Sequence, residues 1–317
     1  MPLGWYLAQG LIPLGPSDSD DEEGPCELPN GRIVCGPHGF VVCHKCFTDY
    51  SDMEDVIDDT KKNKDDDSDD GALINEDRLF DLFGAGTEKK GTGRVIPTSF
   101  IPPTNSITRA PLELFPGQAT RAHRLRYIHC DEPHSVLVFT DGACLNNGLS
   151  NPKAGWAFVY RPPHSSMAGP VAISARLETQ GPFGDESIQT SNRAELRAVI
   201  AALGFRHWSS EGFRTMTIAT DSAYVVEGAT KGVWRWIRNG WKTVENEDVK
   251  NKDLWEMLFG EVEKWNEEGL SIRLWWIPRS LNKDADAAAK KAAERDTASA
   301  TWIDPKISCS KEQLALS

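Results

Sequence analysis

The order of the apolar segments in the C-terminal half is the feature that most constrains the fold. Short runs rich in β-branched residues alternate there with longer runs whose apolar positions recur every three or four residues, which indicates strands and helices. Three strands come first, and helices and strands then alternate. This order predicts an α/β fold with a five-stranded mixed sheet flanked by helices. The expected strands are 135–141, 155–160, 170–178, 214–220 and 271–277, and the expected helices are 190–208, 222–242, 251–268 and 282–295.

The distribution of charge and tryptophan places the folded mass in the same half. Residues 1–130 hold 22 acidic and 13 basic side chains (net −9), and residues 131–317 hold 25 and 22 (net −3). Ten of the eleven tryptophans lie between Trp156 and Trp302. Acidic runs at 18–23 and 52–70 repel themselves and bury no apolar surface, so they indicate disorder. We expect a disordered acidic tail over 1–24, a small Cys/His segment over 25–50, an acidic and Pro/Gly-rich linker over 51–130, a folded domain over 131–300 and a tail over 301–317.

Composition also excludes some classes of protein. The 317 residues carry a net charge of −12 and contain no apolar run near the roughly 20 residues that span a bilayer, so we expect no membrane segment. The N-terminus lacks the basic start and the cleavage site of a signal peptide. Seven cysteines do not form a complete disulfide framework, which favours an intracellular, reducing compartment, either nucleus or cytoplasm.

Four carboxylates fall at the ends of expected elements. Asp141 ends the first strand and Asp221 follows the fourth, while Glu195 and Asp286 lie in the first turns of two helices. Side chains at such positions can meet at one edge of the sheet, where open α/β sheets bind ligands. Two Mg²⁺ ions held by an acidic cluster can hydrolyse a phosphodiester, with Mn²⁺ as an alternative ion. The alternative interpretation is ordinary helix capping and turns.

The sequence motifs around these carboxylates distinguish the two interpretations. TDGAC, TSNRAEL, ATDSAYV and NKDADAAAK follow one another, and together they resemble the ribonuclease H type 1 family over about residues 133–297. The resemblance implies an RNase H-like fold, with Asp141, Glu195, Asp221 and Asp286 as the catalytic metal ligands. It also implies an endonuclease, acting as a monomer, that cuts the RNA strand of RNA–DNA hybrids and leaves 3′-hydroxyl and 5′-phosphate ends.

The resemblance further implies substrate contacts. Asn147, Ser191 and Asn192 correspond to residues that contact ribose 2′-hydroxyls, the group that distinguishes RNA from DNA. Thr190 and Asn251 correspond to a pocket for a DNA phosphate. The alternatives are a turn role for Asn147, which lies next to a glycine, and a helix N-cap role for Asn251.

Residues 230–243 (TKGVWRWIRNGWKT) resemble the family's basic protrusion, in which aromatic residues and cations alternate along the DNA strand. Trp236 is the candidate substrate contact there. The alternative is that Trp236 and Trp241 are core residues of a small helical unit.

The sequence departs from the family at several points. The loop over 278–282 is short and holds no histidine, although Arg279 supplies a positive charge there. Gly232 replaces an aromatic residue, and Ile188 and Val244 stand where polar side chains are usual. We therefore expect slower turnover and weaker hybrid affinity than in typical family members.

The N-terminal half contains two pairs of residues with the spacing of metal ligands. Cys35 and His38 form one pair, and Cys43 and Cys46 form the other, which makes Zn²⁺ a candidate cofactor. Unligated thiols or a redox pair are the alternatives. The same segment is a candidate for recruiting a protein partner.

Two other functions compete with the nuclease. A catalytically weak or inactive RNase H-like protein could serve as a nucleic-acid-binding module or a scaffold. A transposase or integrase core of related fold is the other alternative, although such cores use three acidic residues and lack the TSNRAEL motif.

Overall fold

The computed structural model describes residues 12–13, 25–28, 33–35, 39–43, 48–49, 90–103, 110–121, 123–163, 171–243, 246–303 and 305. The predicted acidic tail over 1–24, most of the Cys/His segment, the linker up to residue 89 and most of the C-terminal tail lie outside these residues. Among the helices it describes, none combines the length and the apolar character needed to cross a membrane.

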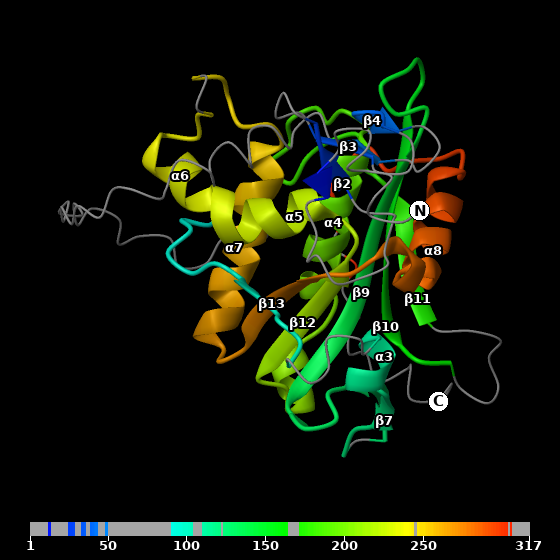
Figure 1. The fold of residues 1–317 in the computed structure, drawn as a ribbon, viewed down its shortest axis with the longest axis vertical. Helices are drawn as coiled ribbons and strands as arrows, with labels where there is room; N and C mark the ends of the chain where they lie inside the picture. The colour runs from blue at the N-terminus through cyan, green and yellow to red at the C-terminus, as the bar shows by residue number, and fades with distance from the viewer. Residues whose placement is uncertain are drawn as a thin grey trace.

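The centre of the molecule is the predicted mixed sheet (Figure 1). Three strands form an antiparallel meander, and two more run parallel to the first of them, so the predicted order of five strands is confirmed. The sheet order is β11-β10-β9-β12-β13. These strands are β9 (Ser135–Leu145), β10 (Lys153–Arg161), β11 (Val171–Arg176), β12 (Thr215–Thr220) and β13 (Ser271–Trp276).

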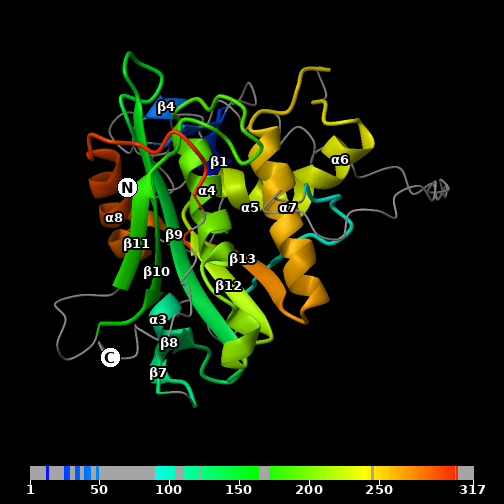
Figure 2. The same cartoon turned by 180° about the vertical axis from the view of Figure 1, so that it is seen from behind.

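Helices cover both faces of the sheet, as Figure 2 shows from behind. Alternate residues of β9 point to opposite faces, so Val136 and Val138 join one core while Leu137 and Phe139 join another. The helices are α3 (Pro111–Leu114), α4 (Ser191–Gly204), α5 (Ala223–Glu227), α6 (Val233–Arg238), α7 (Lys252–Glu267) and α8 (Lys283–Ala293), with a π-helical turn, η3 (Gly228–Gly232), between α5 and α6.

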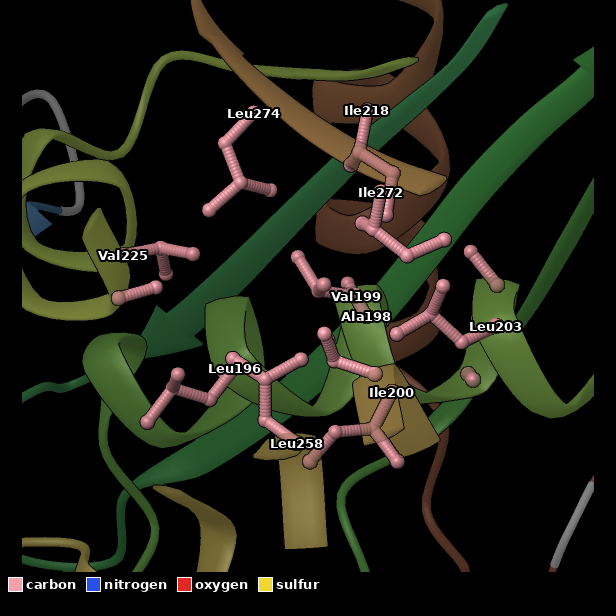
Figure 3. Packing of buried hydrophobic residues seen from close by; sticks show 14 of the residues in the cluster. Leu196, Ala198, Val199, Ile200, Leu203, Ile218, Val225, Leu258, Ile272 and Leu274 are labelled. Atoms are coloured by element: carbon pink, nitrogen blue, oxygen red, sulfur yellow. The ribbon is translucent and has the colours of Figure 1, made fainter. Parts of the chain in front are cut away.

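The larger core lies between the sheet and helices α4, α5 and α7. Leu196, Val199 and Leu203 recur at helical spacing along α4 and pack against Ile218 of β12 and Leu258 of α7 (Figure 3). Because this face of α4 is apolar over its whole length, burial against the sheet fixes both the position and the rotation of the helix. Burial of α4 therefore also fixes the position of the site residues at its N-terminus.

On the opposite face, α8 packs directly on β10. A Cβ at Gly155 would lie 2.3 Å from the backbone nitrogen of Ala293, so only glycine permits this approach. The alanines of α8 continue the close contact, with Ala289 against Ala143 and Ala157. This contact sets the position of the first turn of α8, which carries Asp286.

The folded part begins earlier than the predicted boundary at residue 131. Phe100, Phe115 and Tyr127 are buried in the second core, where the ring centroid of Phe100 lies 4.8 Å from that of Trp275 and 5.7 Å from that of Phe115. Residues 98–103, 110–121 and 123–128 therefore cover the second face of the sheet and do not act as a linker. They add three strands: β6 (Thr98–Ser99) beside β13, β8 (Leu125–Ile128) beside β9, and β7 (Gly117–Ala119) beside β8.

Residues 90–96 pack across α7. The backbone N–H of Thr92 and that of Arg94 donate to Oε1 of Glu263 at 2.9 and 3.0 Å, and the N–H of Gly91 donates to the carbonyl of Glu256 at 2.8 Å. A Cβ at Gly91 would lie 2.2 Å from the nitrogen of Gly260. The buried carboxylate of Glu263 thus anchors the segment that leads into β6.

The N-terminal strands are short. Cys26 and Val34 pair across two of them and are buried together. Burial raises the pKa of the Cys26 thiol to about 11, so this sulfur stays protonated at neutral pH. One antiparallel sheet holds β1 (Ile12–Pro13), β2 (Pro25–Glu27) and β3 (Ile33–Cys35), and another holds β4 (Val42–Cys43) and β5 (Thr48–Asp49).

Candidate active site

Asp141 is the most buried of the four predicted carboxylates, and the glycine that follows it brings a second one close. A Cβ at Gly142 would lie 2.1 Å from the backbone nitrogen of Glu195, so the N-terminal turns of α4 rest directly on β9. Thr190 caps that helix by accepting from the N–H of Arg193 at 3.3 Å. The Asp–Gly pair and this cap together bring Glu195 beside Asp141.

Ser222 holds the carboxylate of Glu195. Its hydroxyl donates to Oε2 of Glu195 and accepts from the N–H of Val225 at 3.2 Å, which also caps α5. Ser222 follows Asp221 in the ATDSAYV motif, so one short turn both presents Asp221 and orients Glu195.

Asn282 holds Asp221. Its side-chain nitrogen donates to Oδ1 of Asp221 at 2.6 Å and to the carbonyl of Thr140 at 3.0 Å, which ties the start of α8 to the middle of β9 and to the residue after β12. No role for Asn282 was predicted from the sequence. Its place in the NKDAD motif, immediately before a helix, was the signal that could have indicated one.

Two cations contact Asp286. Lys290, one turn further along α8, places Nζ 2.8 Å from Oδ2 of Asp286. Arg279 contacts Oδ1 of Asp286, and its Nε lies 4.0 Å from Oδ2 of Asp221. The arginine in the short loop therefore lies between two of the four predicted carboxylates.

The carboxylates are close enough to perturb one another. Burial raises the pKa of Asp141 well above its usual range, and the charge of Asp221 raises it further. Asp286 and Glu195 act in the same direction, while Arg279 opposes them. Burial lowers the pKa of Arg279, but the surrounding carboxylates outweigh this effect and raise it above its ordinary value. The cluster therefore has an excess of negative charge that favours a bound cation.

Among the four carboxylates, one buried oxygen has no hydrogen-bond partner in the described part of the chain. Oδ2 of Asp141 is buried and accepts no hydrogen bond from any residue that the structure describes. A buried carboxylate oxygen without a donor costs free energy unless a cation supplies the missing interaction. The donors here are all carboxylate oxygens, the ligands that Mg²⁺ and Mn²⁺ prefer. These residues fit a divalent cation.

The predicted ribose contacts lie together near this cluster. The side-chain amide of Asn147 donates to Oγ of Ser191 at 3.3 Å, and its oxygen accepts from the N–H of Ser191 at 3.4 Å. Asn192 follows in the first turn of α4 and is also buried. The structure brings the loop after β9 and the start of α4 together, as a shared substrate contact requires.

Arg193 connects the two residues of the predicted phosphate pocket. Its N–H donates to Thr190, and its Nη1 donates to Oδ1 of Asn251 at 3.4 Å. The guanidinium also binds Asp253 through two hydrogen bonds of 2.8 and 2.6 Å. Asn251 itself occupies the N-cap position of α7 with a φ of 58°, but its side chain makes no capping bond and donates instead to the Tyr224 hydroxyl at 3.0 Å.

The assignment of Trp236 as a substrate contact is wrong in this structure. The residue is 1% exposed and packs against Trp255 with ring centroids 5.3 Å apart, so its face cannot stack on a base or sugar. Gly232 leaves room for the Trp236 ring, since a Cβ there would lie 3.0 Å from it. The exposed aromatic of this segment is Trp234. The alternative interpretation, a core residue, is confirmed for Trp236.

Other predicted positions are only partly described. Ile188 is 68% exposed beside the pocket residues, whereas Val244 lies outside the described residues. Of the four predicted zinc ligands, Cys35 is buried on β3, Cys43 lies on β4, and His38 and Cys46 are outside the described part of the chain.

Comparisons with known proteins match the same region. The family model described as RNase H matches residues 133–294. The ribonuclease H of Treponema pallidum is 36% identical over 169 residues, covering 51% of this chain and 93% of that protein. The ribonuclease H of Agrobacterium fabrum is 35% identical over 164 residues, covering 50% and 94%. Among solved structures, LC9-RNase H1, described as a type 1 RNase H with the type 2 active-site motif, is 26% identical with a TM-score of 0.39, covering 58% and 82%.

Proposed function

The chain belongs to the ribonuclease H family and is a ribonuclease that acts on RNA–DNA hybrids, and from that premise we propose that Asp141, Glu195, Asp221 and Asp286 carry the reaction. The observation that supports this assignment is the convergence of four carboxylates around one buried oxygen of Asp141 that has no donor among the described residues.

The four carboxylates would hold two Mg²⁺ ions, with Mn²⁺ as an alternative. Such ions activate the attacking water and stabilise the leaving oxygen, which gives 3′-hydroxyl and 5′-phosphate ends. The remaining residues position the carboxylates. Ser222 orients Glu195 and Asn282 orients Asp221, so each of these ligands is held on rigid structure before substrate binds.

Substrate selection would depend on the pair formed by Asn147 and Ser191. Both side chains are buried and bond one another at 3.3 and 3.4 Å, so a ribose 2′-hydroxyl would reach them only by opening this pair, and the long distances leave these bonds weak enough to be exchanged. Asn192 would contact the same strand, whereas Thr190 and Asn251 would hold a phosphate of the DNA strand. In this proposal Trp236 only supports the fold.

A charge-matched pair of variants on α8 tests the carboxylate assignment. Asp286→Asn removes a proposed ligand, whereas Asp284→Asn removes an exposed carboxylate two residues away on the same helix. With an RNA–DNA hybrid in Mg²⁺, we expect Asp286→Asn to reduce cleavage by at least about 10²-fold and Asp284→Asn to leave it within about twofold. Equal losses would show that bulk charge, and not the site, controls the rate.

The N-terminal segment supports a separate proposal. Cys35, His38, Cys43 and Cys46 have the residue types and spacing of a zinc site. Metal analysis of the purified full-length chain beside Cys43→Ser tests it. We expect one equivalent of zinc in the wild type and none in the variant, and a wild-type chain without zinc would refute the site. A protein partner bound through this segment would then lose affinity in Cys43→Ser.

A further inference from the structure

The hairpin formed by β7 and β8 carries a concentration of arginine that the catalytic site does not use. Residues 117–128 (GQATRAHRLRYI) include three arginines and one histidine and no acid, in a chain whose net charge is −12. Arg121, His123 and Arg124 are exposed in the turn of the hairpin. Figure 1 shows β7 at the lower end of the sheet, beyond α3.

The carboxylate of Glu211 binds three of the arginines around this hairpin. Arg126 binds Glu211 through two hydrogen bonds of 2.8 and 2.9 Å, Arg206 binds it at 2.6 Å and Arg124 at 3.2 Å. The side chain of Glu211 is only 7% exposed, so its charge is used inside the cluster. Arg121, exposed in the same hairpin, adds a fourth guanidinium, so these five residues together carry a surplus of three positive charges.

The arginines of this cluster differ in exposure, and the exposed ones carry the surplus charge at the surface. Arg126 is buried with its guanidinium 5.3 Å from the centroid of the Tyr160 ring, and Arg206 lies 5.3 Å from the Phe205 ring. These two arginines are held by aromatic rings and by Glu211. Arg124 shares the same carboxylate but keeps 52% of its side chain exposed. Arg126 and Arg206 therefore bind Glu211 at shorter distances than Arg124 does, and the exposed Arg121 and Arg124 can contact a ligand at the surface.

This surface is distinct from the catalytic carboxylates. Glu211, which holds the cluster, precedes Gly212, whose carbonyl oxygen lies 2.8 Å from Nδ1 of His134, just before β9. Asp141 lies six residues beyond Ser135 along that strand, which corresponds to roughly 20 Å at about 3.3 Å per residue. That separation exceeds the Debye length of about 8 to 10 Å at physiological salt, so the two sites act on different parts of a ligand.

We propose that Arg121 and Arg124, supported by Arg126, Arg206 and Glu211, form an accessory binding site for the phosphodiester backbone of nucleic acid. Guanidiniums bind phosphate through paired hydrogen bonds more readily than ammonium groups do, and the outer positions of this cluster are arginine and histidine. The choice of nucleic acid over an acidic protein rests on the proposed function, because this chain already acts on a nucleic acid. The ligand is either a continuation of the bound hybrid or a second strand.

The length of hybrid needed to reach both sites follows from the spacing. At about 3.4 Å per base pair, roughly 20 Å corresponds to about six base pairs beyond the scissile phosphate. A hybrid of about 10 base pairs centred on the active site extends about five base pairs to each side and stops short of the hairpin, whereas one of about 30 base pairs extends past it. The accessory site should therefore affect binding of the long hybrid only.

Binding measurements with two double variants of equal charge test the proposal. The test variant is Arg121→Gln with Arg124→Gln, both exposed, and the control is Arg94→Gln with Lys264→Gln, both exposed near α7. Fluorescence anisotropy in Ca²⁺ gives the affinity for each hybrid across a salt series. We expect the test variant to bind the long hybrid about 10-fold or more weakly at low salt, and its salt slope to fall by about 2 in log–log units.

Several outcomes decide between the ligands. Competition by duplex DNA or single-stranded RNA, with no effect of hybrid length, would identify a second strand as the occupant. An unchanged affinity and slope in the test variant, or an equal loss in the control, would overturn the proposal, as would stronger competition by polyglutamate than by nucleic acid. Cleavage of the short hybrid by the test variant should equal that of the wild type. Failure here would therefore leave the proposed function intact.

Discussion

Arg279→Gln should destabilise the protein most when no divalent cation is present. The guanidinium contacts Asp286 and lies 4.0 Å from Oδ2 of Asp221, with 21% of its side chain exposed. Burial, and then the charges of the neighbouring carboxylates, raise the pKa of Asp141, and Arg279 is the positive charge that opposes this shift. Glutamine keeps most of the side-chain volume and removes the charge.

The magnitude follows from the charges and their separation. Two unit charges 4 Å apart interact by about 4 kcal/mol at an effective dielectric constant near 20. Partial exposure and the desolvation of the arginine reduce this value to about half, so we expect a loss of about 2 kcal/mol. For a folded domain of this size, about 1 kcal/mol corresponds to about 2 to 4 °C, which gives a decrease in Tm of about 4 to 8 °C.

Thermal unfolding followed by circular dichroism in EDTA and in saturating Mg²⁺ provides the assay. Divalent cations offset the same repulsion, so the difference in Tm between wild type and Arg279→Gln should shrink to less than half in Mg²⁺. Isothermal titration should also show tighter Mg²⁺ binding by the variant, because a competing cation has been removed. Arg279→Lys, which keeps the charge, should stay near the wild type in EDTA. A Tm difference that is equal or larger in Mg²⁺ would refute the reasoning.

Three further predictions follow from packing. Gly142→Ala places a methyl group 2.1 Å from the nitrogen of Glu195, so hybrid cleavage should fall by at least about 10²-fold in steady-state kinetics, and a wild-type rate would contradict the close approach. Glu263→Ala leaves the backbone N–H groups of Thr92 and Arg94 unpaired and should lower the free energy of unfolding in urea by about 2 kcal/mol. An unchanged midpoint of urea unfolding would show that this contact does not stabilise the fold. Trp302→Ala removes the ring whose centroid lies 3.8 Å from the guanidinium of Arg197. The free energy of unfolding in urea should fall by about 1 to 2 kcal/mol, while the rate of hybrid cleavage stays unchanged. A selective loss of activity would contradict this structural role.

The sheet and the cluster of four carboxylates could be predicted because their signals are local. The strand before Asp141 contains an uninterrupted apolar run, and the apolar face of α4 recurs at helical spacing, so periodicity identified both. The strand was predicted to end at Asp141, but β9 continues to Leu145 because residues 141–145 still pair with β10. The acids themselves stand out only within their motifs, since Glu195 or Asp286 alone is an ordinary residue in a helical first turn. The structure adds the contacts that hold them, such as that between Asn282 and Asp221.

The second core was missed because its signals are short and its partners are distant. Phe100 and Phe115 lie in brief apolar groups within a Pro- and Gly-rich stretch, and such groups have no periodicity to detect. The anchor between Thr92 and Glu263 joins residues 171 positions apart. Trp236 was misplaced for the opposite reason: aromatic residues among cations are typical of nucleic-acid contacts, and only packing shows which ring is buried.

Single-turnover cleavage by Asp141→Asn tests the central claim most directly. Asparagine has the size of aspartate but lacks its charge, and Asp141 is the buried centre of the cluster. With enzyme in excess over a labelled RNA–DNA hybrid in Mg²⁺, the account predicts a rate at least about 10²-fold below wild type. Hybrid affinity in Ca²⁺ should stay within about threefold, and single-stranded RNA should not be cut by either protein. An Asp141→Asn protein that cleaves the hybrid at the wild-type rate would contradict the account.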